Sequence, residues 1–421
     1  MQKSKSSRII GRLYGAGDVV EVQVDALSGK ITSITPTNEE SELIILPGLV
    51  DLHTHLRQPG QENSETIATG SRAAAAGGYT CVHAMANTIP VSDTASSVEQ
   101  TARIGDEVGL VEVRPIGAVT KGLNGVKMAE LGAMAESNAK VKMFSDDGKC
   151  VFDPLIMRRA LEYVKAFDGI IAQHSQDPRL TENAQMNEGA LSSKLGLQGW
   201  PAVAEESIIA RDILLAKHTG SRLHICHLST KGAVEIVRFA KSQGINVTAE
   251  ATPHHLYLSE EELAEYNPRY KVNPPLRRRE DVEAVQQGVI DGTIDIIGTD
   301  HAPHALELKY CNFQDSAFGM TGLETALRVI DAVFIKTDRL TWRDVVRIMS
   351  EKPAQIVGLS SQGQELKVGN VANICVYNPN AESEIVPEEQ YTKSTNSPFK
   401  HKTLPGEVVA TFYRGRQTHG G

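Results

Sequence analysis

Short apolar runs recur through the middle of the chain, and longer helical stretches separate most of them. Residues 64–78, 153–167 and 201–219 are examples of the helical stretches. This alternation is typical of βαβ units in a parallel sheet. The predicted strands cover residues 48–54, 79–86, 110–120, 139–144, 169–174, 222–228, 245–252 and 293–300. Eight parallel strands with crossovers predict an α/β fold, a closed TIM-type (β/α)8 barrel with its chemistry at the C-terminal ends of the strands.

Both ends of the chain have a different pattern. They alternate apolar and polar residues in short pieces bounded by Gly, Pro and Asn, as in RIIGRLYG, DVVEVQVD and KITSITP near the start and VANICVYN and GEVVATFYRGR near the end. Such pieces are typical of small antiparallel sheets. We predict that residues 1–47 and 362–421 together form one small β domain and that residues 48–361 form the barrel.

Composition narrows the class of protein. The 421 residues are 41% apolar and 23% charged, which is enough for a large core. The net charge is −9 with scattered basic residues, so no nucleic-acid partner is expected, and no apolar run approaches the ~20 residues of a membrane helix. The N-terminus, MQKSKSSRII, leads into no sustained apolar segment and does not resemble a signal peptide.

The five cysteines are far apart and form no CxxC pair, which argues against a disulfide framework and favours reduced thiols. They are Cys81, Cys150, Cys226, Cys311 and Cys375. We therefore expect a cytoplasmic enzyme that acts on a small-molecule substrate.

Candidate metal ligands gather at the predicted strand ends. His53 and His55 are two positions apart on the first strand, so both face the same side. His-x-His alone is weak evidence, but later strands end in further ligand types. These are the pair Asp146 and Asp147, then His174, His227 and Asp300. Imidazole and carboxylate ligands without thiolates suit one or two Zn²⁺ ions.

Longer segments around these residues resemble the amidohydrolase superfamily and, within it, the long bacterial-type dihydroorotases. The match covers nearly the whole chain. The segments that carry it are LPGLVDLHTHLRQPG, AAAAGGYTCVHAMANT, FSDDG, VTAEATPHHL, YKVNPPLR, DGTIDIIGTDHAPH and AFGMTGLETAL. Together they are far more specific than the metal ligands, which many hydrolases share.

The resemblance implies a role for each ligand. His53, His55 and Asp300 would hold one zinc, and His174 and His227 the second. Asp147 would bridge the two ions where many relatives use a carboxylated lysine. The sequence leaves open whether Asp146, or a carboxylated Lys142 or Lys149, takes that place, and whether two zinc ions bind or one.

The resemblance also implies a substrate pocket, with Asp300 as catalytic acid and base. The substrate-binding set would be His55, Arg57, Asn87, Asn273, His304 and the backbone of Phe318 and Gly319.

The implied reaction is the reversible, zinc-dependent interconversion of (S)-dihydroorotate and N-carbamoyl-L-aspartate in de novo pyrimidine (UMP) biosynthesis. A metal-bound hydroxide would attack the ring amide while Asp300 moves the proton. The segment from Ala305 to Met320 follows the catalytic strand, and we expect it to close over the substrate.

Two alternatives remain. A hydantoinase- or allantoinase-like cyclic amidase shares the barrel and the metals, and a non-catalytic dihydroorotase-like subunit could act as a scaffold. We expect a homo-oligomer, and an association with aspartate transcarbamoylase is a further expectation. The sequence departs from the family pattern at Ala86, where proline is usual, and at Gln176, where many relatives carry Glu.

Four further histidines have weaker assignments. His224 is expected to be a satisfied core residue facing the helices. His254 and His255 are expected to have supporting or structural roles. His83 has no assigned role.

Overall fold

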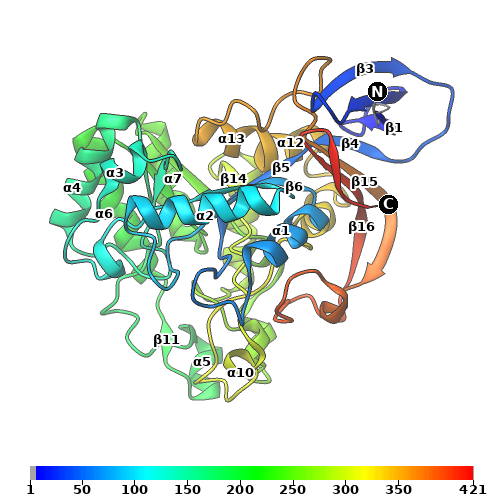
Figure 1. Cartoon of the computed structure of the whole chain (residues 1–421). Coiled ribbons are helices and arrows are strands. Elements are labelled where there is room, and N and C mark those ends of the chain that lie inside the picture. The colour runs from blue at the N-terminus through cyan, green and yellow to red at the C-terminus, as the bar shows by residue number, and fades with distance from the viewer. Residues whose placement is uncertain (1–5, 421) are drawn as a thin grey trace.

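Parallel strands form the centre of the protein, whose computed structural model describes residues 6–420 (Figure 1). Residues 1–5 and 421, which belong to the predicted terminal segments, lie outside the described part. Each apolar run predicted as a strand contains one, although several are shorter than predicted. They are β5 (Leu49–Thr54), β6 (Tyr79–Ala84), β7 (Glu112–Pro115), β8 (Met143–Phe144), β9 (Ile170–Gln173), β12 (Arg222–Ile225), β13 (Val247–Ala251) and β14 (Ile296–Ile297).

These strands form two parallel sheets within residues 6–420, in the orders β5-β6-β7 and β14-β13-β12-β9-β8. Isolated parallel bridges join their edges. Gly117, beyond β7, pairs with Phe144 of β8, and Thr54 of β5 pairs with His301, beyond β14. The strands therefore follow one another in chain order, and their C-terminal ends point the same way.

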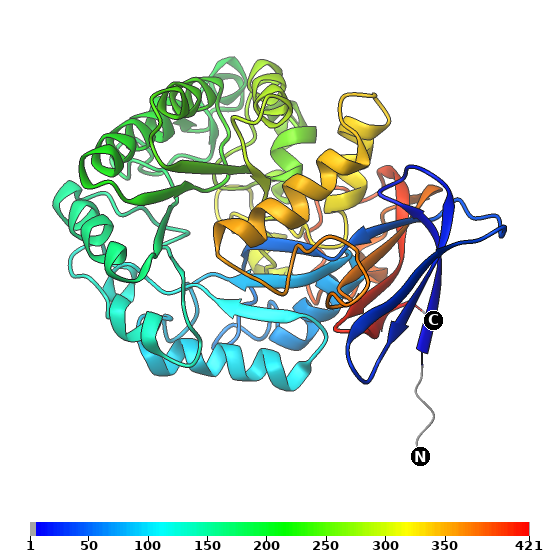
Figure 2. The same cartoon turned by 90° about the horizontal axis from the view of Figure 1, so that it is seen from above.

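Helices pack outside these strands, as the cyan and green helices show in Figure 2. The principal ones are α1 (Ile67–Ala76), α2 (Ala95–Val108), α4 (Pro154–Val164), α6 (Val203–Thr219), α7 (Lys231–Ser242) and α9 (Arg279–Ile290). The helical pattern predicted three of them, α1, α4 and α6. Their starts follow local chemistry, since the side chains of Thr66 and Asp153 accept hydrogen bonds from first-turn amides of α1 and α4.

The strands at the two chain ends share one sheet, in the order β17-β16-β15-β4-β1-β2-β3. Ile45 and Ile374 pack in its core with Val22 and Val24. The strand β4 was not predicted, yet it joins the two chain ends by pairing parallel to β1 and antiparallel to β15. The strands are β1 (Ser6–Leu13), β2 (Val19–Asp25), β3 (Lys30–Pro36), β4 (Ile44–Pro47), β15 (Ile374–Glu384), β16 (Thr403–Tyr413) and β17 (Arg416–His419).

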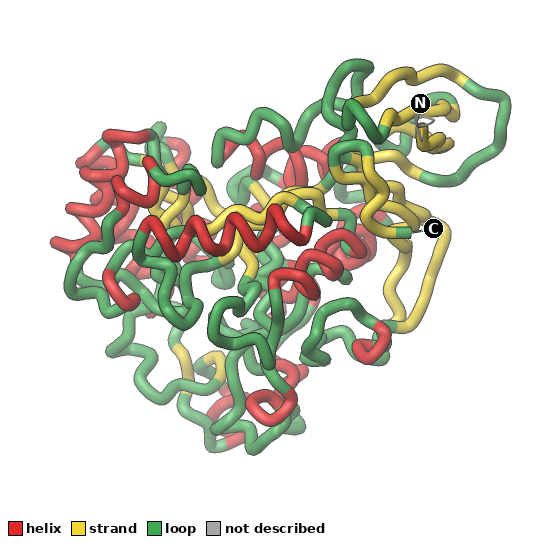
Figure 3. The backbone as a smooth tube through the Cα atoms, in the orientation of Figure 1, coloured by secondary structure: helices red, strands yellow, loops and turns green. Residues whose placement is uncertain are grey.

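Shorter elements lie in the long connections, and Figure 3 shows how much of the lower part of this view is loop. The short helices are α3 (Leu131–Glu136), α5 (Ala190–Leu195), α8 (Pro253–Tyr257), α10 (Leu306–Lys309), α11 (Ala326–Ile330), α12 (Trp342–Val346) and α13 (Lys352–Ile356), and the short strands are β10 (Met186–Asn187) and β11 (Gly199–Trp200). Single turns of 3₁₀ or π-helix occupy Lys121–Leu123, Lys165–Phe167, Glu260–Leu263, Pro268–Tyr270, Asp331–Ile335, Arg347–Glu351 and Pro387–Glu389.

One connection of the terminal sheet reaches back toward the parallel strands. Residues 385–402, between β15 and β16, include a stretch whose amides at Tyr391 and Thr392 both donate to the Glu324 carboxylate at 3.0 Å. Further along, the Ser394 hydroxyl donates to the Ser64 carbonyl. This segment therefore lies against residues that follow β5 and β14.

Membrane-spanning helices and paired cysteines are both absent from residues 6–420. No helix within residues 6–420 is both long and apolar enough to span a membrane. The five cysteines are all unpaired, and only Cys311 is exposed.

The Glu324 contact makes stability depend on pH. Burial raises the pKa of this carboxyl to about 7 from an ordinary value of 4.5, against the two amide hydrogen bonds. A raised folded-state pKa gives stability that is present below pH ~4.5 and is lost as the pH rises through about 7. Glu324→Gln removes this titration but leaves one acceptor oxygen for the two amides. We therefore expect the change in melting temperature that it causes to be roughly 1–3 °C more favourable at pH 8 than at pH 5.

Calorimetry at both pH values checks this expectation. Glu283, an exposed residue of α9, supplies the matched control Glu283→Gln, which should shift neither value. An equal shift for Glu324→Gln at pH 5 and pH 8 would contradict the linkage.

Candidate metal centre

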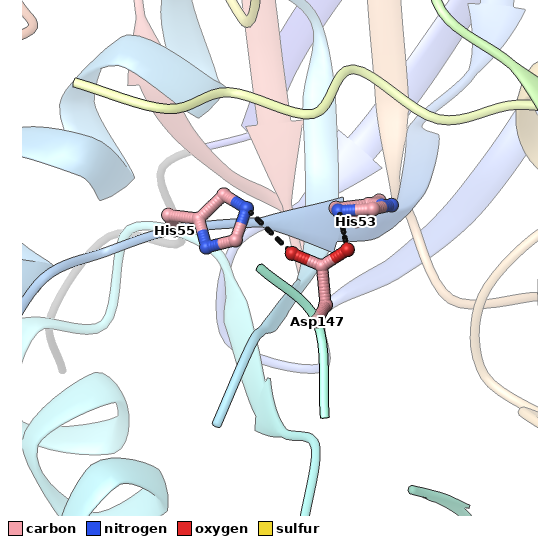
Figure 4. Close-up of side chains that lie close together, drawn as sticks. All are labelled: His53, His55 and Asp147. Carbon is pink, nitrogen blue, oxygen red and sulfur yellow. Dashed lines mark ion pairs between the residues drawn. The ribbon is translucent and has the colours of Figure 1, made fainter. Parts of the chain in front are cut away.

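Four histidine side chains converge on the carboxylate of Asp147. His174 Nδ1 and His227 Nε2 each lie 3.2 Å from Oδ1 of Asp147. On the other side, His53 Nε2 lies 3.5 Å from Oδ1, and His55 Nε2 lies 3.3 Å from Oδ2. Figure 4 shows that the carboxylate lies between His53 and His55. All five side chains are buried, so their charges have little access to water.

Asp300 completes the cluster from the loop that follows β14. Its Oδ1 lies 3.1 Å from His55 Nε2 and 3.5 Å from His53 Nε2. Asp300 and His227 have positive φ angles of 45° and 31°, and Arg57 has one of 60°. These conformations are unfavourable for non-glycine residues and are typical of functional sites, where the surroundings hold a side chain in a required direction.

The nitrogens that face away from Asp147 are held by acceptors. His53 Nδ1 contacts Glu250 Oε1, His55 Nδ1 lies 2.9 Å from Asn87 Oδ1, and His174 Nε2 lies 2.7 Å from Gln176 Oε1. An acceptor at one ring nitrogen places the proton there and leaves the lone pair of the other nitrogen facing the cluster. This is the arrangement that metal-ligating histidines usually have.

Sequence reasoning did not assign Glu250 to the site. It lies in β13, and its carboxylate also contacts His224 Nε2 at 3.2 Å and the His227 amide at 3.2 Å. A carboxylate inside an otherwise apolar strand was the available signal, since such a group is rarely buried without partners.

The charges of the cluster shift its pKa values strongly. Burial disfavours the charged form of His53, but the carboxylates of Glu250, Asp147 and Asp300 outweigh that effect and raise its pKa. Burial likewise opposes ionisation of Asp147, yet the surrounding histidines hold its pKa well below the ordinary value. The pKa of Asp300 is lowered in the same way, against burial, by His53 and His55. Both carboxylates are therefore ionised at neutral pH.

The cluster fits a divalent cation. The Nε2 atom of His53 is buried without a hydrogen-bond partner, although it faces two carboxylates at 3.5 Å. Potential ligand atoms converge within 4.8 Å of one another in two groups that share Asp147. One group contains His53 and His55 and the other contains His174 and His227. A cation between the lone pairs and the carboxylates would satisfy both, and this donor set suits zinc.

The alternatives to Asp147 point elsewhere. The Asp146 carboxylate accepts the amides of Val119 and Thr120 at 2.8 and 2.9 Å and also the Thr120 hydroxyl. Lys142 is exposed and donates to the Phe167 carbonyl, and Lys149 is exposed as well. The structure thus brings Asp147, rather than these three side chains, among the histidines.

Beside the cluster, Arg57 is buried without a carboxylate partner among residues 6–420. Its Nε donates to the Pro303 carbonyl at 3.0 Å, and its Nη2 lies 3.4 Å from His304 Nε2. Burial lowers the pKa of the guanidinium to about 10, despite Asp300 and Asp147 nearby, so it remains charged at neutral pH. A buried cation without an ion-pair partner is costly, which points to an anionic ligand.

His304 and Gly319 form the wall next to Arg57. His304 Nε2 donates to the Phe318 carbonyl at 2.7 Å, and burial together with Arg57 lowers the pKa of the imidazole to about 3, so it is neutral. Gly319 has a φ of 145°, and a Cβ there would lie 2.7 Å from His304 Nε2. Only glycine fits this position, because a side chain would displace the imidazole.

Asn273 also lies near the cluster, on the loop before α9. Its Nδ2 donates to Gln176 Oε1 at 3.0 Å, while its Oδ1 is buried without a hydrogen-bond partner. A buried amide oxygen without a donor is unfavourable, so this atom is poised to accept a hydrogen bond from a ligand.

Two lysine side chains hold the segment from Ala305 to Met320. The ammonium of Lys309 donates to the carbonyls of Lys271 and Ala317, and that of Lys271 donates to the carbonyls of Phe313 and Gln314. Neither lysine has a carboxylate partner in the described residues.

Asn396 contacts the residues just before this segment and Gly319 near its end. Its Oδ1 accepts the His304 amide at 3.2 Å, and its Nδ2 donates to the carbonyls of Ala302 and Gly319 at 3.0 and 3.1 Å. Sequence reasoning missed it because it lies more than 90 residues from the motif that it supports.

The remaining histidines lie around the centre. His224 is buried as predicted, but it bonds Thr248 and Glu250 and so supports His53 through the Glu250 carboxylate. His83 donates to the Asp51 carbonyl across β5 and β6.

His254 and His255, the two histidines of the TPHHL segment, follow β13. His255 contacts Thr252 Oγ1 and the Pro274 carbonyl, and His254 packs against it with ring centroids 4.5 Å apart. Burial lowers the pKa of His254 to about 4. These contacts stabilise the segment that follows β13.

Comparison with known sequences gives consistent matches. Residues 42–233 match the family model described as dihydro-orotase-like. A dihydroorotase of Leifsonia xyli subsp. xyli is 61% identical over 376 residues, covering 89% of this chain and 86% of that protein. One of Streptomyces coelicolor is 57% identical over 402 residues, with 96% and 93% covered. One of Mycobacterium tuberculosis is 49% identical over 416 residues, with 97% and 96% covered.

Two solved structures have the same fold. A dihydropyrimidinase from Brevibacillus agri matches with a TM-score of 0.84 at 20% identity, covering 98% of this chain and 94% of that one. An L-hydantoinase (dihydropyrimidinase) from Arthrobacter aurescens matches with a TM-score of 0.84 at 23% identity, with 97% and 94% covered. At these identities the likeness establishes the fold.

Asp147 belongs to both groups of potential ligands, so its substitution tests metal binding. Zinc should raise the melting temperature of the metal-free protein, because a ligand that binds only the folded state stabilises it. Asp147→Asn removes a charge common to both groups and should weaken zinc binding about 10-fold or more. Competition with a chromophoric chelator measures the affinity.

Asp146→Asn is the matched control. It perturbs the bonds to Val119 and Thr120, so it should lower stability while zinc affinity stays within about twofold. Equal losses of zinc affinity in the two variants would contradict the assignment of Asp147.

Proposed function

The chain belongs to the dihydroorotase family of cyclic amidohydrolases, and from this premise we propose that it interconverts (S)-dihydroorotate and N-carbamoyl-L-aspartate in de novo pyrimidine biosynthesis. Both molecules carry a carboxylate next to an amide. A site for them needs a positively charged side chain to bind the carboxylate, next to the group that activates the amide. Arg57 is such a side chain, and it lies beside the cluster around Asp147.

The observation that carries this proposal is the buried Arg57 guanidinium. It lies in the loop after His53 and His55, and within residues 6–420 no carboxylate pairs with it. A substrate carboxylate would supply the missing charge through two parallel hydrogen bonds. Hydantoin, the substrate type of the hydantoinase alternative, has no carboxylate on its unsubstituted ring. Arg57 therefore favours dihydroorotate over a simple cyclic amide.

We also infer the finer architecture. The two parallel sheets would close into a (β/α)8 barrel made of residues 48–361, and residues 1–47 and 362–421 would form a small β domain. Support comes from the bridges between the sheet edges and from the pairing of β4 with β1 and β15.

We assign the metal ligands in two sets that share Asp147. His53, His55 and Asp300 would hold one zinc ion, and His174 and His227 the other. When bound, zinc supplies positive charge that polarises a carbonyl group and makes water more acidic.

The protein's own groups orient the substrate and move its proton. Arg57 and the Asn87 amide would hold the carboxylate, while neutral His304, whose ring proton binds the Phe318 carbonyl, would line the pocket beside it. Asn273 with the Phe318–Gly319 backbone would contact the ring. Holding the reacting groups in place removes much of the entropic barrier.

Asp300 is the proposed acid and base. Its carboxylate is ionised at neutral pH and lies 3.1 Å from His55 Nε2, at the edge of the cluster. It can therefore accept a proton from the attacking water and return it to the leaving ring nitrogen.

The scaffold alternative is disfavoured because the full set of ligand types converges in the structure. A cytoplasmic location is proposed on the unpaired state of the five cysteines. A homo-oligomer and an association with aspartate transcarbamoylase stay predictions.

The first experiment measures hydrolysis of L-dihydroorotate by the purified, zinc-loaded protein. The loss of ultraviolet absorbance reports the rate. We expect turnover that a chelator abolishes and zinc restores. Asp300→Asn should lower kcat by roughly 10²–10⁴-fold while retaining part of the zinc. No turnover by the metal-loaded protein, together with turnover of hydantoin, would favour the alternative amidase.

Arg57 is tested through substrate binding. Arg57→Ala removes charge-assisted hydrogen bonds and should raise KM for dihydroorotate by roughly 10- to 100-fold, with zinc content unchanged. Arg57→Lys keeps the charge but loses the paired geometry, so an intermediate KM is expected. An unchanged KM for Arg57→Ala would refute the carboxylate role.

A further inference from the structure

We propose that Gln176 is a positioning residue that fixes, through one amide group, both the metal-facing nitrogen of His174 and the ligand-facing oxygen of Asn273. The part that concerns the substrate rests on the proposed function. The part that concerns the metal does not.

The orientation of the Gln176 amide follows from a chain of hydrogen bonds that starts at a fixed acceptor. The Thr181 hydroxyl lies 2.9 Å from the Asp177 carbonyl, which can only accept, so Thr181 donates its proton there. Thr181 Oγ1 is then left to accept, and Gln176 Nε2 donates to it at 2.8 Å. With the nitrogen so engaged, Gln176 Oε1 faces the site.

This oxygen fixes the tautomer of His174. An amide oxygen can only accept, and His174 Nε2 lies 2.7 Å away, so the ring proton resides on Nε2. The lone pair of Nδ1 then faces Asp147 Oδ1 at 3.2 Å and His227 Nε2 at 2.8 Å. That is the direction in which a metal would be bound, so the Gln176 amide prepares His174 as a ligand.

The same oxygen fixes the amide of Asn273. Its second lone pair accepts the Asn273 Nδ2 group at 3.0 Å, because a carbonyl oxygen repels another oxygen at that distance. Asn273 Oδ1 therefore points away from Gln176 and is the buried atom without a partner. It is presented as an acceptor, which selects a ligand with an N–H donor, such as the ring of a cyclic amide.

A single side chain thus links the metal centre to the ring pocket. Gln176 is half-buried in the loop after β9, and no other residue in the described chain contacts both His174 Nε2 and Asn273 Nδ2. If Gln176 Oε1 is lost, the His174 imidazole can change tautomer and the Asn273 side-chain amide can flip. Metal affinity and substrate affinity should then fall together.

The test replaces Gln176 with methionine, which has a similar length and no acceptor oxygen. We expect Gln176→Met to weaken the binding of zinc alone by roughly 10- to 100-fold, measured by chelator competition without substrate. At saturating zinc, KM for dihydroorotate should rise about tenfold while kcat changes less than threefold. Gln176→Glu restores acceptor oxygens and should return both zinc affinity and KM to within about threefold of the native values.

Gln185 provides the matched control, since it lies in the same loop, is also half-buried, and donates to the Asn183 carbonyl instead. Gln185→Met should leave zinc affinity and KM unchanged. Native zinc affinity in Gln176→Met would overturn the proposal, as would a loss that Gln176→Glu does not rescue. A protein that binds zinc in this pattern but does not hydrolyse dihydroorotate would refute only the proposed function.

Discussion

The carboxylate of Asp147 is the interaction on which the arrangement of this protein depends. Four imidazole nitrogens lie within 3.5 Å of its two oxygens, and all of these side chains are buried. So many polar groups are stable together only if each is paired, because an unpaired buried charge costs several kcal/mol. The outer nitrogens are therefore bound to Glu250, Asn87 and Gln176. Positive φ angles at His227 and Asp300 are accepted because the surrounding fold fixes the directions of these side chains.

The sequence predicted the strands and the residues at their ends because both depend on local pattern. Apolar runs identified the strands of the two larger parallel sheets, and a two-residue period placed His53 and His55 on one face. The sequence pattern could not show whether Asp146 or Asp147 faces the histidines, because two adjacent aspartates differ only in the direction in which their side chains point. The structure resolves the direction through Val119 and Thr120, which bond to Asp146 from a neighbouring strand end.

The supporting residues were harder to predict, for a physical reason. Glu250, Gln176 and Asn396 act through hydrogen bonds to residues that are distant in the sequence, and amide and carboxylate groups leave no periodic signal. Gln176 was noticed only as a departure from the family pattern, because its contact to Asn273 comes from a loop that is 97 residues away in the sequence. The strand β4 was missed for a similar reason, since four residues carry little pattern and its partners come from both ends of the chain.

The position of Asn396 also has a consequence for the order of events during synthesis. A ribosome makes the chain from its N-terminus at about 5–20 residues per second, and early segments fold before later ones emerge. His53, Asp147 and Asp300 are all made before Asn396, which ties the loop between Ala302 and Gly319 to the rest of the site. Strand β15, which pairs with β4, is also late. A nascent chain can thus pair its parallel strands before Asn396 and β15 have been made, so the contacts of these two are among the last that the site and the terminal sheet can form.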